Sequence, residues 1–127
     1  MNKKVKNAQK NFYKGIKYRS KLECDAAKCF EEAHIDFQYE PFRIVLIPSF
    51  DYLGKHYIHM TYKPDFVIFD NILIEMKGYP TQAWILKRKI LLKHIIDTDY
   101  EFEFHEVRSI SELKELINII KENEKTK

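Results

Sequence analysis

The stretch YKPDFVIFDNILIEMKG, residues 62–78, carries the strongest signal for the fold of this chain. Two short apolar runs, Phe66–Phe69 and Ile72–Met76, flank the turn-forming pair Asp70-Asn71, and this pattern predicts a β-hairpin. Both runs are apolar at almost every position, which is typical of strands in a central sheet that is covered on both faces. We therefore expect a sheet with helices on either side.

Charged residues lie inside or beside these apolar runs: Asp65, Glu75 and Lys77. An ionised group is costly to bury among Phe, Ile, Val and Leu unless it is paired or binds a metal. Glu75 and Lys77 are two residues apart, so on a strand they point to the same face. A two-residue loop would place Asp65 opposite Met76 and send Glu75 to the other face, so a shared site requires an odd-length loop or a bulge.

These residue types suit a hard divalent cation and an attacking water. Asp65 and Glu75 offer the oxygen ligands that Mg²⁺ or Mn²⁺ prefers, and the main-chain carbonyl of Met76 lies between Glu75 and Lys77. A metal ion lowers the pKa of a bound water and clamps a phosphate, and Lys77 would orient that water or stabilise charge in the transition state. The set predicts phosphodiester hydrolysis.

Length and composition indicate one ordinary globular domain. The chain has 127 residues, of which 45% are hydrophobic and 32% charged, and this composition excludes extensive disorder. No apolar run approaches the roughly 20 residues of a membrane span, and no signal peptide is visible. Cys24 and Cys29 match no metal-ligand spacing, so we expect free thiols in a reducing cytoplasm.

The formal net charge is only +3, but the basic residues are clustered. No acidic residue precedes Glu23, and a second basic cluster lies in a later segment. Such clusters can be solvated surface, but two of them beside an acidic site favour binding of a polyanion such as DNA. The candidate DNA-binding residues are Lys14, Lys17, Arg19, Lys87, Arg88 and Lys89.

The remaining segments predict helices and further strands around the hairpin. We expect residues 1–18 to form a basic arm, with a short helix as one alternative, and residues 19–127 to form a single domain. A turn is expected over Ser49–Gly54. Helices are expected over 20–33, over 81–96 and from residue 110 onward, and strands over 39–47, 56–62 and 100–105. A helix that joins neighbouring strands requires a mixed sheet.

Glu23 has two interpretations. It could reach from the first helix toward the acidic site, or it could complete a capping box with Ser20, a local effect of about 0.5–2 kcal/mol. Glutamine at this position would still cap the helix but would bind a metal less well.

Several stretches together resemble the PD-(D/E)XK nuclease superfamily, and more closely the phage endonuclease I type of Holliday-junction resolvase and related small phage endonucleases. The resemblance covers residues 17–107, and its most specific part is the pairing of Pro-Asp with Glu-x-Lys. The matching strings are YRSKLE at 18–23, FQYE at 37–40, YKPDF at 62–66 and IEMKG at 74–78.

The resemblance implies an α/β fold with a restriction-endonuclease-like core, a central mixed sheet flanked by helices in αβββαβ order, and a C-terminal helix. It also implies Mg²⁺-dependent cleavage that leaves a 5′-phosphate. Asp65 and Glu75 match the family's metal ligands, Lys77 its catalytic lysine and Glu23 its helix carboxylate. Glu40 matches a family glutamate near the site, with a solvent-facing strand residue as the alternative.

The expected protein is a phage or prophage endodeoxyribonuclease that works in the cytoplasm of a bacterial host on branched DNA, as a homodimer like the resolvases. One alternative keeps the fold and chemistry but acts as a nicking, end-processing or sequence-specific DNA nuclease. Another is a catalytically idle DNA-binding accessory. No sequence-reading domain is recognisable, which favours recognition of DNA shape over sequence.

Overall fold

The computed structural model describes residues 10–125, which group into two compact units. The first unit contains the described residues up to Asp36, the short segment Met76–Gly78 and the described residues from Val107 onward. The second contains Phe37–Glu75 and Tyr79–Glu106. The predicted α/β class with a mixed sheet is confirmed, whereas a single domain over 19–127 stays a prediction.

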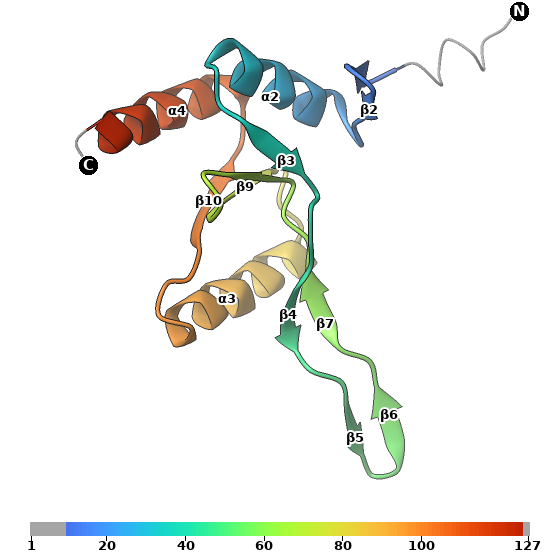
Figure 1. Ribbon diagram of the computed structural model, residues 1–127. Helices are drawn as coiled ribbons and strands as arrows, with labels where there is room; N and C mark the ends of the chain where they lie inside the picture. The colour runs from blue at the N-terminus through green and yellow to red at the C-terminus, as the bar shows by residue number, and fades with distance from the viewer. Residues whose placement is uncertain (1–9, 126–127) are drawn as a thin grey trace, which may run out of the picture. The chain divides into compact units, whose positions relative to one another are not determined.

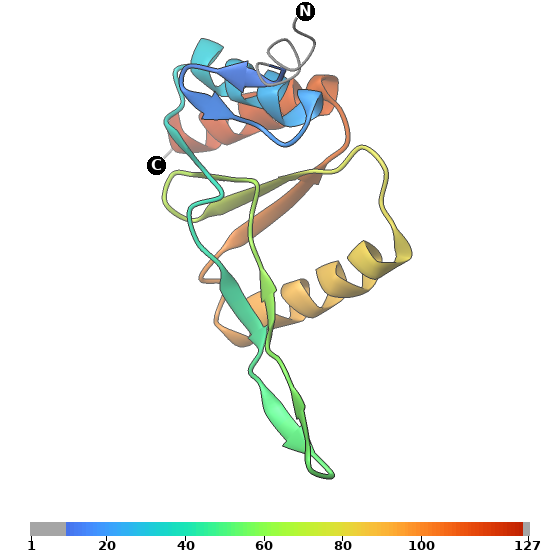
Figure 2. The same ribbon diagram turned by 90° about the vertical axis from the view of Figure 1, so that its right-hand side faces the viewer.

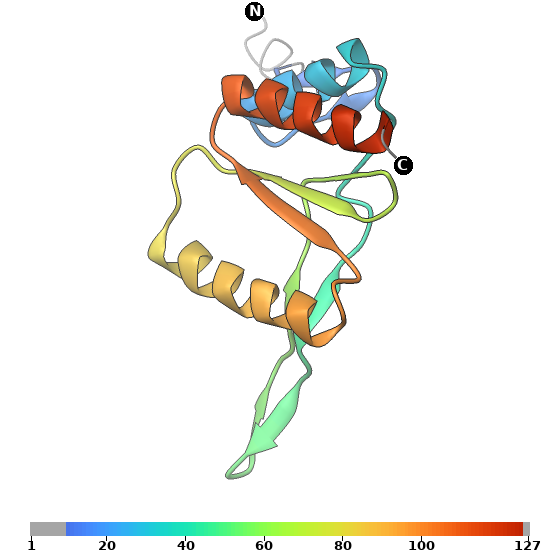
Figure 3. The ribbon, with the colours of Figure 1, turned by 90° about the vertical axis from the view of Figure 1, so that its left-hand side faces the viewer.

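The first unit is built on two helices, α2 (Lys21–Glu32) and α4 (Ile110–Lys125), which pack side by side (Figure 3). Both begin as the sequence predicts. The Ser20 hydroxyl accepts a hydrogen bond from the Glu23 amide at 3.1 Å, and that of Ser109 accepts one from the Glu112 amide at 3.2 Å. Such caps provide an acceptor for backbone amides in the first turn, which have no hydrogen-bond partner within the helix.

A small hairpin precedes α2 in the first unit, where the sequence suggested an arm or a short helix. Its strands are β1 (Phe12–Tyr13) and β2 (Ile16–Lys17), which pair antiparallel. Gly15, with φ 84°, provides the turn between them, because a left-handed conformation costs glycine little. The suggested helix is therefore wrong over these residues, and residues 1–9 of the predicted arm lie outside the described residues.

The second unit contains a four-stranded sheet in the order β10-β9-β8-β3. Its strands are β3 (Phe37–Tyr39), β8 (Phe66–Ile68), β9 (Ile72–Met76) and β10 (Glu103–Val107), the last two ending at the border of the first unit. Strand β8 is antiparallel to both β3 and β9. Strands β9 and β10 run parallel. The Glu103 amide donates a hydrogen bond to the Asn71 carbonyl at one end of the pair, and the Lys77 amide donates one to the Val107 carbonyl at the other end.

The hairpin of β8 and β9 has the odd loop that the shared site requires. Ile68 pairs with Ile72, so the three residues Phe69, Asp70 and Asn71 form the loop. Phe69 and Asp70 adopt left-handed conformations, with φ 48° and 68°. Every residue of β8 and β9 is buried, as the continuous apolar runs predicted.

Helix α3 (Gln82–Asp97) joins β9 to β10 and packs on one face of this sheet (Figure 2). The core between them contains Val67 and Leu73 from the sheet and Trp84, Leu91 and Ile95 from α3. Ile44 and Tyr62 complete the same buried cluster. These contacts come from strand alternation on one side and helical spacing on the other.

A long two-stranded arm extends from the sheet in the second unit (Figure 1). Strands β4 (Ile44–Ile47) and β7 (Met60–Tyr62) form its base, and β5 (Phe50–Tyr52) and β6 (Lys55–Tyr57) form its tip. The predicted turn over Ser49–Gly54 is therefore wrong in its first part, since only Leu53 and Gly54 turn the chain. Leu53 at the tip is 89% exposed.

Two boundaries also differ from prediction. The strand expected over 39–47 is interrupted after β3, where Glu40 adopts a left-handed φ of 47°. The strand expected over 100–105 begins three residues later, at Glu103. Among residues 10–125, no helix combines the length and the apolar character that crossing a membrane requires.

Candidate functional site

Asp65 and Glu75 are neighbours across the β8–β9 hairpin. Phe66 pairs with Ile74, so extending this register by one residue brings Asp65 opposite Glu75. Directly opposed side chains have Cβ atoms about 4.5–5.5 Å apart and lie on the same face. Both are buried, with exposures of 8% and 6%. This register places the two carboxylates that the sequence singled out on the same face of the hairpin.

These carboxylates lie on the face of the sheet that α3 covers. Asp65 is two residues from Val67 and Glu75 two residues from Leu73, and both apolar residues belong to the core formed with Trp84. Residues two apart on a strand share a face. The acidic pair therefore sits at the end of an apolar layer, where charge is costly unless it is compensated.

The Tyr62 hydroxyl donates a 2.7 Å hydrogen bond to Oε1 of Glu75. Tyr62 is 2% exposed, and its ring lies 5.9 Å from that of Trp84. Burial raises the pKa of Tyr62 well above its usual range, and the charges of Glu75, Asp65 and Glu106 raise it further. The hydroxyl therefore keeps its proton and acts as a donor to Glu75.

Glu40 approaches Asp65 from the segment that follows β3. One carboxylate oxygen of Glu40 lies within 4.8 Å of one from Asp65, and the Glu40 amide donates to the Asp65 carbonyl at 2.9 Å. Lys63 Nζ lies 3.4 Å from Oε1 of Glu40. The side chain of Glu40 is only 16% exposed, so the solvent-facing alternative is wrong. Acidic oxygens this close could hold a metal ion.

A third carboxylate on this face, Glu106, was missed from the sequence. It lies two residues after Phe104, which packs on the α3 core, so it shares that face. Its Oε1 accepts a hydrogen bond from the Trp84 indole at 2.9 Å and one from Arg88 at 2.7 Å. The alternation of Phe102, Phe104 and Glu106 was the signal that could have revealed it.

Met76 and Lys77 follow Glu75 directly and belong to the first unit. The Lys77 amide donates to the Val107 carbonyl at 2.9 Å, so the pairing with β10 continues to this residue. By strand alternation Lys77 leaves the chain on the same side as Glu75, whereas the side chain of Met76 takes the opposite side. Only the main-chain carbonyl of Met76 could serve as a ligand.

Glu23 is buried in the first turn of α2, in the first unit. Its backbone amide donates a hydrogen bond to the Ser20 hydroxyl, which is one of the two bonds of the predicted capping box. This leaves a role for the Glu23 carboxylate beyond capping as an open prediction.

The basic residues near the N-terminus are placed differently from one another. Lys14 forms an ion pair with Glu31 of α2, and the same carboxylate accepts a hydrogen bond from the Tyr13 hydroxyl at 3.0 Å. The hydrogen bond to Glu31 raises the pKa of Lys14, which keeps the amine charged. Lys17 and Arg19 are exposed at the surface of the same unit.

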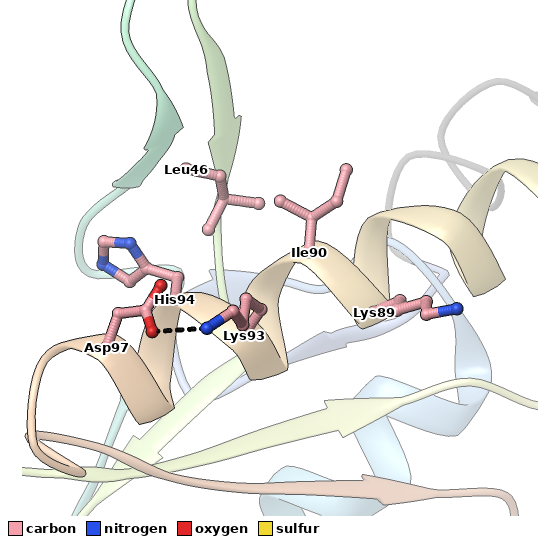
Figure 4. Close-up of a pocket in the computed structure, with 6 residues that line it drawn as sticks. All are labelled: Leu46, Lys89, Ile90, Lys93, His94 and Asp97. Carbon is pink, nitrogen blue, oxygen red and sulfur yellow. Dashed lines mark hydrogen bonds and ion pairs between the residues drawn. The ribbon is translucent and has the colours of Figure 1, made fainter.

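The second basic cluster lies on α3, and its members also differ. Arg88 is directed to Glu106, whereas Lys89 is exposed. Lys89 lines an open groove of about 450 Å³ between α3 and β4, together with Leu46, Ile90, Lys93, His94 and Asp97 (Figure 4). Lys93 is paired with Asp97 at 2.8 Å. Lys87 is half-buried on the same helix.

Over residues 3–115 the sequence matches the family described as "Protein of unknown function (DUF1064)", and the chain belongs to this family. No curated protein and no solved structure gives a significant match to the chain. The geometry of the acidic site is therefore the main indication of function.

Proposed function

We propose that this chain is a Mg²⁺-dependent endodeoxyribonuclease of the PD-(D/E)XK kind. The observation that carries the proposal is the register of the β8–β9 hairpin, in which Phe66 pairs with Ile74, together with the burial of Asp65 and Glu75, the next residue on each side. A hairpin whose only task was to fill a core would place apolar residues at these two positions. A retained pair of buried acids supports a site with chemistry.

The donor set fits a hard divalent cation. Asp65, Glu75 and Glu40 offer carboxylate oxygens, and an oxygen of Glu40 lies within 4.8 Å of one from Asp65. We propose that Asp65, Glu75 and the Met76 carbonyl hold Mg²⁺, with Mn²⁺ as a substitute. When bound, the ion would lower the pKa of a water and stabilise charge on the phosphate.

The other residues of the site have roles that do not depend on ligating the ion. Lys77, leaving β9 on the side of Glu75, would orient the attacking water and stabilise negative charge that develops on the phosphate. The apolar layer of Val67, Leu73 and Trp84 beneath the carboxylates excludes bulk water from one side, which strengthens electrostatic interactions there.

We propose DNA as the substrate, with branched DNA first among its forms. Exposed Lys17, Arg19 and Lys89 are suited to phosphate contacts, and Lys93 lines the same groove as Lys89. Lys14 and Arg88 are held by acidic partners, so their charge is partly neutralised within the protein. Dispersed basic side chains of this kind contact the phosphate backbone of DNA, so they recognise its shape rather than its base sequence.

We also propose that the chain acts as a homodimer, which would allow paired cuts on two strands. Leu86, Leu92 and Ile96 are exposed on α3, although the helix already buries Trp84, Leu91 and Ile95. Exposed apolar side chains on a helix that is already packed on one side support a second contact surface. Sedimentation velocity of the wild type and of Leu86→Glu would test this surface.

The decisive experiment measures Mg²⁺-dependent cleavage of linear, nicked and four-way DNA by the wild type and by Glu75→Gln. The glutamine keeps an oxygen that can accept from Tyr62 but loses the charge that binds a cation. Glu101→Gln is the matched control, because Glu101 is an exposed acid of the same unit. Thermal unfolding of each variant confirms that it is folded.

We expect cleavage by the wild type and by Glu101→Gln, and its loss in Glu75→Gln. Equal cutting of linear and four-way DNA would overturn the preference for branched DNA and favour a nicking or end-processing nuclease. No metal-dependent cutting of any form, with DNA binding retained, would favour the idle accessory.

A further inference from the structure

The outer part of the long arm is exposed along its whole length. Every residue from 47 to 59 is exposed, although β5 and β6 pair regularly within this stretch. A two-stranded hairpin without a covered face is only marginally stable, and contiguous exposed apolar surface is typical of an interaction site. The large apolar side chains of this surface are Ile47, Phe50, Tyr52, Leu53, Tyr57 and Ile58.

The turn at the tip of the arm contains an unusual residue. Tyr52 pairs with Lys55, so Leu53 and Gly54 form a two-residue turn, and both have positive φ, 49° and 77°. Hairpin turns of this kind favour Asn, Asp or Gly, because these residues tolerate a left-handed conformation better than leucine does. Leu53 is also almost fully exposed. Its place is unfavourable in two ways for the protein alone, which supports a function for this side chain.

Contacts behind the tip stiffen the turn. The rings of Phe50 and Tyr57 stack across the two strands, with centroids 5.2 Å apart and planes at 11°. Lys55 Nζ lies 5.5 Å from the centroid of the Tyr57 ring. On the other face of the ribbon, Nδ1 of His56 lies 2.8 Å from Oδ1 of Asp51. The arm therefore presents an apolar side chain on a support that is already ordered before a partner binds.

The charges of the arm favour DNA as that partner. Residues 42–61 contain one acid, Asp51, whereas Arg43 and Lys55 are exposed bases. The base of the arm adjoins the groove between α3 and β4 that Lys89 lines. A two-stranded ribbon fits into a groove of DNA, where apolar side chains can enter between base pairs while basic side chains pair with phosphates.

The form of DNA decides how much such an apolar side chain contributes. In a continuous duplex it must first unstack two base pairs, which costs free energy. The cost is smaller where pairing or stacking is already disturbed, as at a branch point. An apolar side chain that enters the stack therefore gains more affinity on branched DNA than on a duplex.

We propose that the arm is a DNA-binding element and that Leu53 enters the interrupted base stack of a branch point, so that this residue sets the preference for branched over duplex DNA. This inference rests on the proposed function, because it assumes that the substrate is DNA. It goes further by naming the element and the side chain that recognise the branch.

The test compares the wild type with Leu53→Asn, which removes the apolar side chain and suits the left-handed turn, so the variant should be at least as stable. Ile119→Gln is the matched control, because Ile119 is an exposed apolar residue of α4. Fluorescence anisotropy measures binding of duplex and four-way DNA, with Ca²⁺ in place of Mg²⁺. A fluorescent adenine analogue at the branch point reports unstacking by a rise in its emission.

We expect Leu53→Asn to weaken binding of four-way DNA about tenfold, because one large apolar side chain is no longer buried in the complex. Binding of duplex DNA should change much less, and the rise in emission should be lost. Ile119→Gln should match the wild type in each measurement. Unchanged affinity for four-way DNA, or an equal loss for both forms, would overturn the inference.

Cleavage and sedimentation separate this inference from the proposed function and from a contact between copies of the chain. If the wild type cuts DNA and Leu53→Asn binds it equally well, the proposed function stands and the role of the arm is overturned. Binding that depends on Leu53 without any metal-dependent cutting supports the arm and overturns the nuclease. A wild type that binds no DNA overturns both. Sedimentation velocity without DNA that shows a dimer for the wild type and a monomer for Leu53→Asn would assign the tip to a protein contact and overturn the inference.

Discussion

Arg88 of α3 donates a 2.7 Å hydrogen bond to Oε1 of Glu106 on β10, and the side chain of Arg88 is only 29% exposed. This pair ties the helix to the sheet next to the acidic site. We expect Arg88→Met to lower the free energy of unfolding by about 1–3 kcal/mol, because it removes a donor from the Glu106 carboxylate, whose side chain is only 10% exposed. Urea denaturation measures the change, and unaltered stability would contradict it.

Lys89, the next residue on α3, should behave in the opposite way. It is exposed, so Lys89→Ala should leave the stability nearly unchanged. Loss of one phosphate contact should reduce the slope of log affinity against log salt by about 0.9. Binding of a DNA duplex at several salt concentrations, with Ca²⁺ in place of Mg²⁺, provides this slope. A slope equal to that of the wild type would remove Lys89 from the DNA surface.

Lys77 offers a test of chemistry apart from metal binding. We expect Lys77→Met to lower kcat by about 10²–10³-fold, the typical cost of removing one group that stabilises transition-state charge. Mn²⁺ affinity should be kept, because lysine is not a ligand of the ion. Lys114→Met, on the exposed surface of α4, serves as the control. If Lys77→Met cuts at the wild-type rate, the assigned role is wrong.

Substitutions at Ser20 and Glu23 distinguish helix capping from catalysis. Ser20→Ala should cost about 0.5–2 kcal/mol of stability, because it removes the acceptor for the Glu23 amide. Glu23→Gln should leave the cap intact and yet reduce metal-dependent cleavage about tenfold or more. Thermal unfolding and cleavage assays are run on both variants. Full activity in Glu23→Gln would restrict Glu23 to a structural role.

The buried thiol of Cys29 should make the folded protein less stable at alkaline pH. Burial raises the pKa of the Cys29 thiol, an effect that nearby Lys114 partly offsets. The folded chain therefore binds this proton more tightly than the unfolded chain. Its contribution is fully present below the unfolded pKa of about 8.5 and is lost as the pH rises through the folded pKa. Urea denaturation on both sides of this range should show a smaller decline for Cys29→Ala than for the wild type.

The parts of the fold that were predicted correctly have strong local signals. Ser20 and Ser109 each begin a helix with the expected cap, and the apolar runs around Asp70-Asn71 form the expected hairpin. The odd loop followed from requiring Asp65 and Glu75 on one face. Each of these features is encoded within a few residues, so no knowledge of distant contacts was needed.

The arm was harder to predict because it lacks the usual signature of a strand. Phe50–Tyr52 and Lys55–Tyr57 are exposed at every position, so no buried face imposes alternation on their sequence. The residues around Gly54 also have turn chemistry, which concealed how short the turn is. The hairpin of β1 and β2 was missed for a different reason, because strands of two residues are too short to show a pattern.

The site was only partly visible in the sequence because some of its members come from distant elements. Asp65 and Glu75 lie in one hairpin, but Tyr62 and Glu106 are contributed by β7 and β10. Their proximity depends on how strands are ordered in space, which local patterns do not specify. Arg88 was likewise assigned to DNA because its acidic partner lies 18 residues away.

The parallel pairing of β9 with β10 has a consequence for synthesis on the ribosome. All of α3 lies between these strands, so β9 leaves the ribosome well before its neighbour on that side exists. During this interval an apolar strand has one open edge, and such edges promote association between nascent chains. Production yield should therefore respond to slower translation and to chaperone supply more strongly than the stability of the finished protein suggests.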